Sequence, residues 1–278
     1  MRVIDVLRGN ARDARTLGTG VLRRHFDAAI GRGPTRLHLK HVGSFLIRPR
    51  TSDFRVLRQV MVERQYDLSC FAQDARVQAA YERIVAAGRT PLIIDLGANV
   101  GASTLWYARA YPAAHVVAVE PDPSNADLCR QNTAGRDVEV LTAAAGSTPG
   151  FVSVSGDDEE KWAVTTARDD HGSTRICLVN DIVSEVPNST LFIVKVDIEG
   201  FESDLFSGNT EWVQQAALVI IEPHDWMVPD AATSRTFQRV FGALDYDLLI
   251  RGENVVYVRR ESGQAIEDAD LALADLVG

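Results

Sequence analysis

Two carboxylates close neighbouring apolar runs of the sequence: Asp95 follows Leu92-Ile93-Ile94, and Glu120 follows Val116-Val117-Ala118-Val119. In open parallel sheets, ligands bind beyond the carboxyl ends of the strands, so both acids are candidates for ligand contact. A carboxylate at the first position can attract a cationic group, directly or through water. One at the second position can accept hydrogen bonds from both hydroxyls of a ribose. The pair therefore predicts a site for a nucleoside ligand that carries positive charge.

A glycine-marked turn follows the first run, in the order Asp95-Leu96-Gly97-Ala98-Asn99-Val100-Gly101. Gly97 and Gly101 would let the backbone approach a ligand without an intervening Cβ, and Asn99 can donate and accept hydrogen bonds. The spacing is not the Gly-x-Gly-x-x-Gly of pyrophosphate binders, and no Gly-Lys-Ser/Thr follows. The turn and Glu120 together favour S-adenosylmethionine, whose ammonium and sulfonium stand where a dinucleotide has a pyrophosphate. The alternatives are an ordinary turn capped by Asp95 and a Glu120 that only caps the next helix.

Catalytic groups are expected after two later apolar runs. The first leads into Lys195-Val196-Asp197-Ile198-Glu199-Gly200, where strand alternation would point Lys195, Asp197 and Glu199 the same way at first, although a turn expected near Asp197 breaks that geometry. The second ends in Glu222-Pro223-His224, and an imidazole has an ordinary pKa near neutrality. We assign Asp197 or His224 as the general base that assists a hydroxyl nucleophile. Lys195 and Glu199 are expected to position the acceptor or each other.

Two other interpretations of these residues stay open. Charged groups at a strand end need partners, so Lys195, Asp197 and Glu199 could form an ion-pair cluster without chemistry, and His224 could be a surface residue. Asp197, Glu199 and Glu222 are also oxygen ligands of the type that hard divalent cations prefer. The sequence does not require a metal, and the predicted site contains none.

Beyond Thr90, short apolar runs alternate with helical stretches, which is typical of βαβ units around a parallel sheet. Strands are predicted at 92–94, 115–119, 138–141, 191–196 and 217–221, and helices near 103–111, 125–132, 181–185, 202–213 and 234–244. Two more runs, 246–250 and 254–258, flank Arg251-Gly252-Glu253 and predict a hairpin. The expected fold class is α/β: a doubly wound, mostly parallel, Rossmann-like seven-stranded sheet with a C-terminal antiparallel hairpin.

Residues 1–50 are rich in arginine and are interrupted by Gly18, Gly20, Gly31 and Gly33. We expect a basic N-terminal extension whose helices pack on the main domain, and a membrane-surface or partner-binding role is the alternative. Residues 51–278 form the expected main domain. Within it, two helices are expected in 51–88, the cofactor-binding core in 90–260 and an acidic tail in 261–278, with a terminal helix over 267–276.

The composition limits the kinds of partner and location that we expect for the chain. A net charge of −9 argues against a general nucleic-acid binder, because a grip on phosphates needs a basic face, so a small-molecule acceptor is favoured. Cys70, Cys129 and Cys177 form no C-x-x-C pair, which predicts neither a disulfide framework nor a zinc site and fits a cytoplasmic location. No window approaches the roughly 18 apolar residues of a membrane span. Assembly as a homo-oligomer is left open.

The sequence resembles the FkbM-type methyltransferases, which are similar in fold to other class I S-adenosylmethionine enzymes and usually methylate hydroxyl oxygens. The resemblance rests on Ile94 to Gly101, Val119-Glu120-Pro121 and Val194 to Glu202, and spans about residues 50–260. It implies cofactor contact by Asp95, Gly97, Asn99, Gly101 and Glu120, with Asp197 and Glu199 lining the active cleft. It does not fix the acceptor, because members act on macrolides, sugars and other secondary metabolites.

The expected activity is methyl transfer from S-adenosylmethionine to a hydroxyl of a small molecule such as a sugar or secondary metabolite. A nicotinamide-dependent oxidoreductase is one rival, and the missing dinucleotide fingerprint and the antiparallel finish of the sheet count against it. A non-catalytic protein that keeps the cofactor fold is the other. If the arginine-rich segment covers the cleft, it could help to select the acceptor.

Overall fold

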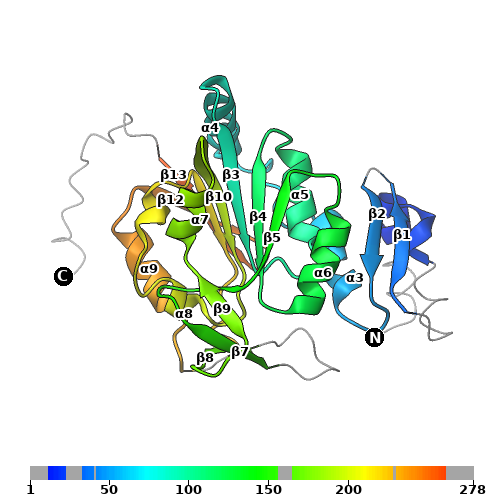
Figure 1. Ribbon diagram of the computed structural model, residues 1–278. Helices are drawn as coiled ribbons and strands as arrows, with labels where there is room; N and C mark the ends of the chain where they lie inside the picture. Colours follow the sequence, from blue (N-terminus) through cyan, green and yellow to red (C-terminus); the bar gives the residue numbers. More distant parts are fainter. Residues whose placement is uncertain (1–11, 23–32, 41, 156–164, 228–229, 261–278) are drawn as a thin grey trace, which may run out of the picture.

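The computed structural model describes residues 12–22, 33–40, 42–155, 165–227 and 230–260, and its centre is a seven-stranded sheet (Figure 1). The strands lie in the order β12-β13-β11-β10-β3-β4-β5. Their bounds are β3 Thr90–Leu96, β4 His115–Glu120, β5 Val138–Thr142, β10 Ser189–Val196, β11 Leu218–Ile221, β12 Tyr246–Arg251 and β13 Asn254–Arg259. The strands from β11 to β5 are parallel, and β13 is antiparallel to both β11 and β12. The predicted parallel sheet with its antiparallel hairpin is therefore confirmed.

The chain builds this sheet outward from its centre in two directions. From β3 it proceeds through β4 to β5 at one edge, and from β10 it proceeds through β11 to the hairpin at the other. The order reverses between β3 and β10, where Asp95 and Lys195 are paired in register. Ligands bind beyond the carboxyl ends of strands at such switch points, so the fold places the predicted site residues where a ligand would bind.

β3 and β10 are apolar along most of their length because both of their faces are covered. The side chains of Leu92 to Ile94 and of Phe192 to Val194 are fully buried. Lys195 is charged, unlike these neighbours, but it is equally buried, with only 1% of its surface exposed. A buried ammonium needs charged or polar partners, which the site supplies.

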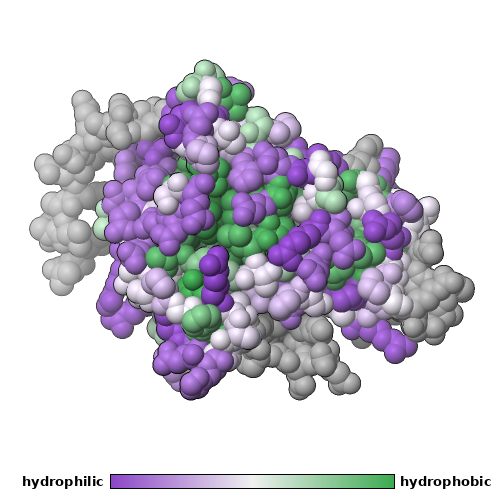
Figure 2. All heavy atoms as spheres, in the orientation of Figure 1, coloured by the Kyte–Doolittle hydropathy of each residue, from purple (hydrophilic) through white to green (hydrophobic). Residues whose placement is uncertain are grey.

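Helices cover the two faces of the sheet. One face packs against α3 (Asp53–Met61), α4 (Asp74–Ala86), α5 (Ala102–Ala110) and α6 (Pro123–Asn132). The other packs against α7 (Val179–Glu185), α8 (Glu202–Leu205), the 3-10 helix η2 (Glu211–Gln214) and α9 (Arg235–Gly242). In the view of Figure 2, hydrophobic residues surface in the middle, over the central strands, with hydrophilic residues around them.

The helix predicted near 202–213 is wrong in extent. α8 ends at Leu205, and the backbone turns before η2 begins at Glu211. Asn209 has a φ of 54° in the left-handed region, which a helix cannot accommodate. The turn residues Gly208 and Asn209 were the sequence signal for this break.

The described part of the arginine-rich segment contains strands that the sequence interpretation did not include. Residues 12–17 are helical and η1 spans Thr19–Leu22, but β1 (Thr35–Leu39) and β2 (Gly43–Ile47) form an antiparallel hairpin. Leu37 and Phe45 are fully buried in the same core as α5. The Leu46 N–H donates to Asn132 Oδ1 at 2.6 Å, and the Leu46 carbonyl accepts from Asn132 Nδ2 at 3.0 Å. The hairpin is therefore attached to α6.

A second, smaller sheet was also not predicted. It contains β6 (Ala144–Ala145), β7 (Phe151–Ser155), β8 (Thr165–Arg168) and β9 (Thr174–Cys177) in the order β6-β9-β7-β8. This sheet lies between β5 and α7 in the chain, and both residues of β6 line the first pocket described below. The predicted acidic tail of residues 261–278 lies outside the described residues. No helix in the described part of the chain is long and apolar enough to cross a membrane.

Candidate active site

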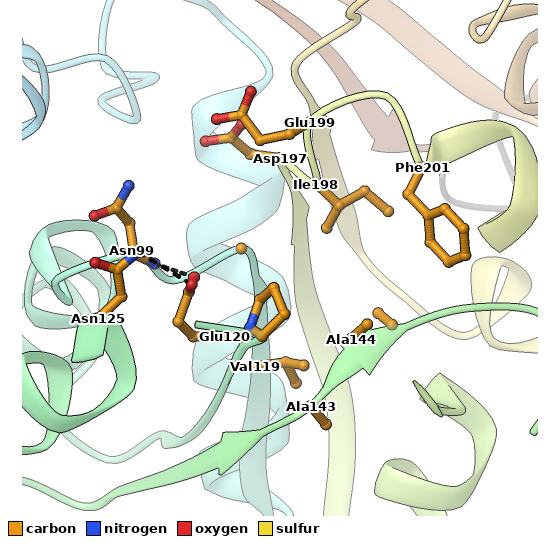
Figure 3. Close-up of a pocket in the computed structure, with 13 residues that line it drawn as sticks. Asn99, Val119, Glu120, Asn125, Ala143, Ala144, Asp197, Ile198, Glu199 and Phe201 are labelled. Atoms are coloured by element: carbon orange, nitrogen blue, oxygen red, sulfur yellow. Dashed lines mark hydrogen bonds between the residues drawn. The ribbon is translucent and has the colours of Figure 1, made fainter. Parts of the chain in front are cut away.

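A pocket opens at the carboxyl edge of the sheet, where β3, β4, β5 and β10 end (Figure 3). This first pocket has an empty volume of about 590 Å³, which includes space open to solvent. Its wall is partly apolar and partly acidic and consists of Gly97, Asn99, Val119, Glu120, Pro121, Asn125, Ala143, Ala144, Ala145, Asp197, Ile198, Glu199 and Phe201. Figure 3 shows Glu120 beside Asn99 and Asn125, with Asp197 and Glu199 together on another side of the pocket.

Glu120 ends β4 and is held by uncharged donors. Its Oε2 accepts from the Asn99 N–H at 2.8 Å, and its Oε1 accepts from the Asp122 N–H at 3.0 Å and from Asn125 Nδ2 at 3.2 Å. Burial raises the pKa of Glu120 to about 7 although these three donors oppose the shift. A carboxylate has about four acceptor sites, so capacity for a further donor remains.

Asn125 connects this carboxylate to the N-terminal hairpin. While its Nδ2 donates to Glu120, its Oδ1 accepts from Arg48 Nη2 at 2.6 Å. Arg48 follows β2 and also pairs with the buried Asp53 carboxylate at the start of α3, at 2.8 Å. The amide of Asn125 is therefore fixed from both of its ends.

The turn after β3 touches the turn after β10, backbone to backbone. A Cβ built on Gly97 would lie 1.7 Å from the carbonyl oxygen of Asp197, and Gly97 also has a φ of 77°. No side chain fits there, so glycine is required at this position. Asn99 and Glu199 adopt left-handed backbones, with φ of 49° and 54°, on these facing turns. Such conformations cost about 1–3 kcal/mol each, and they recur at functional sites.

Asp95 lies behind this turn instead of on a pocket wall. It is fully buried, and its Oδ2 accepts from Ser103 Oγ at 2.7 Å and Thr104 Oγ1 at 2.6 Å on α5. Its Oδ1 is 3.2 Å from Lys195 Nζ, which is also 3.2 Å from Asp197 Oδ2. Although burial alone would lower it, the two aspartates raise the pKa of Lys195 well above its ordinary value. Lys195 is therefore a buried cation that links Asp95 to Asp197.

A second pocket adjoins the first and shares Gly97, Asn99, Asp197 and Glu199 with it. It is covered by α3 and by the segment that follows α3. Its remaining wall is mostly polar and consists of Ser52, Arg55, Val56, Gln59, Val60, Gln65, Tyr66, Ala98, Ser103, Lys195, Glu222, His224, Trp226 and Glu253. Among the described residues, none before Ser52 lines this pocket. The two pockets meet at Asp197 and Glu199.

His224 follows β11 and is only 2% exposed, so the alternative of a surface histidine is wrong. Its Nδ1 is 2.8 Å from Oε1 of Glu202, which is fully buried on α8. Burial alone would lower the pKa of His224, but Glu202 and the nearby carboxylates raise it to about 9. Burial and the Asp197 charge raise the pKa of Glu199, and the same two causes raise that of Glu222.

The structure gathers most of the predicted site residues at one edge and separates two of them from the pocket walls. Gly97, Asn99, Glu120, Asp197 and Glu199 line the first pocket, and Lys195 and His224 line the second. Asp95 is buried, and a Cβ on Gly101 would lie 2.9 Å from Cys129 Sγ, so this glycine serves the packing of α5 on α6.

Several pocket residues were missed by sequence reasoning. They are Asn125 on α6, the three alanines Ala143, Ala144 and Ala145 that follow β5, and the apolar residues Ile198 and Phe201 that follow Asp197. The alanines follow the third parallel strand at the same edge as Asp95 and Glu120, and this position was the available signal. Their small side chains leave room that larger ones would fill.

A doubly wound sheet of this strand order with acidic pockets at its carboxyl edge is the class I methyltransferase fold. The profile of the methyltransferase FkbM domain matches residues 95–245, which is more than half of the 278 residues. The chain therefore belongs to the FkbM methyltransferase family, as the resemblance implied.

Curated relatives match part of the chain. 2-O-methyltransferase NoeI of Sinorhizobium fredii is 24% identical over 155 residues, which are 49% of this chain and 64% of NoeI. Hexuronic acid methyltransferase AglP of Haloferax volcanii is 28% identical over 177 residues, which are 60% of this chain and 70% of AglP. The match to NoeI thus spans less than two thirds of that protein.

Solved structures are similar at lower identity. A methyltransferase from Geobacter sulfurreducens is 16% identical and covers 75% of this chain and 89% of its own, with a TM-score of 0.36. Magnesium protoporphyrin IX methyltransferase from Synechocystis PCC 6803, solved with bound SAM, is 13% identical and covers 76% and 93%, also with a TM-score of 0.36.

Proposed function

We propose that this chain is an S-adenosylmethionine-dependent O-methyltransferase that acts on a hydroxyl of a small molecule such as a sugar or secondary metabolite. The observation that carries the proposal is the shared wall of the two pockets in a chain of the FkbM family: Asp197 and Glu199 face both. A donor in the first pocket and an acceptor in the second would meet there. Proximity of this kind can supply a large part of a rate enhancement.

The residues of the first pocket fit the cofactor. Glu120 has acceptor capacity left for ribose hydroxyls, and Val119, Pro121, Ile198 and Phe201 offer apolar surface for a base. Asn99 and the carboxylates of Asp197 and Glu199 are placed to meet a cationic amino-acid group. Asp95 and Gly101 would act indirectly, by holding the turn that carries Gly97 and Asn99.

S-adenosylmethionine, when bound, supplies an electrophilic methyl group to the acceptor. The polar second pocket would bind the acceptor and orient its hydroxyl toward the shared wall. Asp197 is the better candidate for contact with that hydroxyl, because its side chain is 25% exposed whereas that of His224 is 2% exposed and enclosed by carboxylates. Lys195 would hold Asp197 in place, and His224 would position the carboxylates.

Calorimetric titration of the purified chain with S-adenosylhomocysteine and, separately, with NAD tests the cofactor. We expect binding of the first at micromolar concentration and none of the second. Binding of NAD in preference to the thioether nucleoside would instead support the oxidoreductase.

A methyl-transfer assay over an acceptor panel tests the activity. The names of NoeI and AglP suggest sugars with a free 2-hydroxyl and hexuronic acids as the first acceptors to try, alongside other hydroxylated metabolites. Release of S-adenosylhomocysteine together with a methylated hydroxyl is the expected result. Tight cofactor binding without turnover on any acceptor would favour a non-catalytic protein.

A further inference from the structure

Three side chains of metal-ligand type converge in the second pocket. Asp197, Glu199 and His224 each offer one ligand atom, and these atoms all lie within 4.8 Å of one another. They come from two elements: Asp197 and Glu199 lie on the turn after β10, and His224 lies on the segment after β11. Carboxylates alone often cluster without an ion, so His224 decides whether this is a site.

His224 directs one ring nitrogen at the carboxylates without a hydrogen bond. Its Nε2 is 3.6 Å from Asp197 Oδ1, 3.8 Å from Glu199 Oε2 and 3.9 Å from Glu222 Oε1. These separations exceed a normal N–H···O distance of about 2.7–3.2 Å. Within the described residues, Nε2 therefore has no hydrogen-bond partner although the side chain is 2% exposed.

The other ring nitrogen of His224 is fixed in the way that metal-binding histidines usually are. Nδ1 is 2.8 Å from Glu202 Oε1, and the Glu202 side chain is fully buried. A bound ion would displace the Nε2 proton that the surrounding carboxylates favour, and the Glu202 carboxylate would then select the tautomer with the proton on Nδ1, orient the ring and leave Nε2 as the free lone pair. That lone pair then points toward Asp197 and Glu199.

The spacing and the charge both suit one small cation. Ligands about 2.1 Å from an ion lie about 3.0–3.4 Å apart in octahedral or tetrahedral geometry. The His224 separations of 3.6 and 3.8 Å would need to shorten by a few tenths of an ångström, and the remaining separation, which is within 4.8 Å, by up to about 1.4 Å. Asp197 has Lys195 as a partner, but Glu199 accepts no hydrogen bond from the described part of the chain. A cation bound to Nε2 would take over the positive charge that the displaced His224 proton supplies to these carboxylates.

We propose that Asp197, Glu199 and His224 bind a divalent first-row transition-metal ion, with Glu202 as the positioning residue of His224. Imidazole together with carboxylates favours ions such as Mn²⁺ or Fe²⁺ over the all-oxygen ions Mg²⁺ and Ca²⁺. Three protein ligands would leave coordination positions free for a ligand from the second pocket, which all three residues line. The sequence alone did not require this metal.

An ion held by these residues would give the acceptor hydroxyl a ligand position, and this role rests on the proposed function. A hydroxyl oxygen bound to a divalent cation loses its proton more readily. As that oxygen bonded to the methyl carbon, its proton would pass by way of Asp197 to water, and the electron pair of the carbon–sulfur bond would stay on sulfur. The product ether is a weaker ligand than the alkoxide and can leave.

Mn²⁺ binding to the chelator-treated chain, followed by electron paramagnetic resonance of free Mn²⁺, tests the site without any turnover. We expect one Mn²⁺ per chain, and an affinity at least tenfold lower in E199Q and in H224Q. E199Q is the first choice because Glu199 is partly exposed and its loss leaves no buried partner. The matched controls are E139Q, an exposed glutamate on β5, and H171A, an exposed histidine, which should bind Mn²⁺ as the unchanged chain does.

Titration of the same samples with S-adenosylhomocysteine separates the two proposals. Nucleoside binding without Mn²⁺ binding at millimolar concentration would overturn the metal site and leave the proposed function intact. Equal Mn²⁺ affinity in E199Q, H224Q and the unchanged chain would also overturn it, since the ion would then bind elsewhere. Site-dependent Mn²⁺ binding without nucleoside binding would support the metal site and count against the proposed cofactor.

Discussion

The two pockets hold their carboxylates in opposite ways. In the first, Glu120 accepts hydrogen bonds from two backbone N–H groups and one amide, all uncharged. In the second, Asp197, Glu199 and Glu222 crowd around one lysine and one histidine, and Glu222 has one amide donor, Gln65 Nε2 at 3.3 Å. A carboxylate already held by neutral donors suits a neutral hydroxyl ligand. Carboxylates that lack donors suit a positive charge.

Disrupting the backbone contact between Gly97 and Asp197 should have the largest effect, because this contact supports both pockets. G97A should lower the free energy of unfolding by at least about 3 kcal/mol and abolish nucleoside binding, since its Cβ would lie 1.7 Å from the Asp197 carbonyl oxygen. Gly135 is the matched control: its φ is 79°, but nothing lies within 4 Å of an added Cβ. G135A should cost only the left-handed backbone, about 1 kcal/mol. Equal denaturant midpoints for the two variants would contradict the contact.

D197N should lower catalysis without much change in nucleoside binding by the first pocket. If Asp197 contacts the reacting hydroxyl, kcat/KM falls about a thousandfold. The first pocket keeps Glu120, Asn99 and the second carboxylate placed to meet the amino-acid group, Glu199, so the Kd for S-adenosylhomocysteine changes less than tenfold. D181N, on the exposed face of α7, is the control and should retain activity. Near-normal turnover in D197N would remove the assignment.

E120Q should instead weaken nucleoside binding by the first pocket. Loss of a charged acceptor for hydroxyl donors raises the Kd for S-adenosylhomocysteine about 10- to 100-fold. One amide hydrogen would also face the Asn99 or Asp122 N–H, so the melting temperature falls. The exposed glutamate variant E185Q serves as the control in calorimetry and thermal melting. An unchanged Kd would place the ribose elsewhere.

The smallest expected effect is the change of stability and of nucleoside affinity with pH as Glu120 titrates. Because burial raises the pKa of Glu120 to about 7, the folded chain retains a proton that the unfolded chain loses above its ordinary pKa of 4.5. The Glu120 contribution to stability therefore falls as pH rises from 4.5 to about 7. Nucleoside binding needs the ionised form, so affinity should rise up to about tenfold between about pH 6 and 8. An E120Q variant with the same pH profile would show that another group titrates.

The strands of the large sheet could be predicted because their apolar runs are long and their ends carry the turn residues. The hairpin of β1 and β2 was missed although Thr35-Arg36-Leu37-His38-Leu39 alternates as a strand does, since the arginine content favoured a solvated segment. The helix at 202–213 was too long because Gly208 and Asn209 were given too little weight. Local pattern identifies elements well and their ends less well.

The candidate site could be predicted as a set of residues but not as a geometry. Strand ends placed Glu120, Asp197 and His224 at one edge, as the sequence indicated. No local signal showed that Lys195 would lie between Asp95 and Asp197, or that Asp95 would be bound by Ser103 and Thr104. Lys195 and Asp95 are 100 positions apart (195 − 95) on neighbouring strands, a proximity that a single sequence does not reveal.

The chain of contacts from Arg48 through Asn125 to Glu120 affects how any shortened version of the protein should be interpreted. A truncation that removes the N-terminal hairpin frees the Asn125 amide to rotate, although no described residue before Ser52 lines either pocket. Weaker nucleoside binding by such a fragment would show that Asn125 no longer holds Glu120 in place. It would not show that the missing segment touches the ligand.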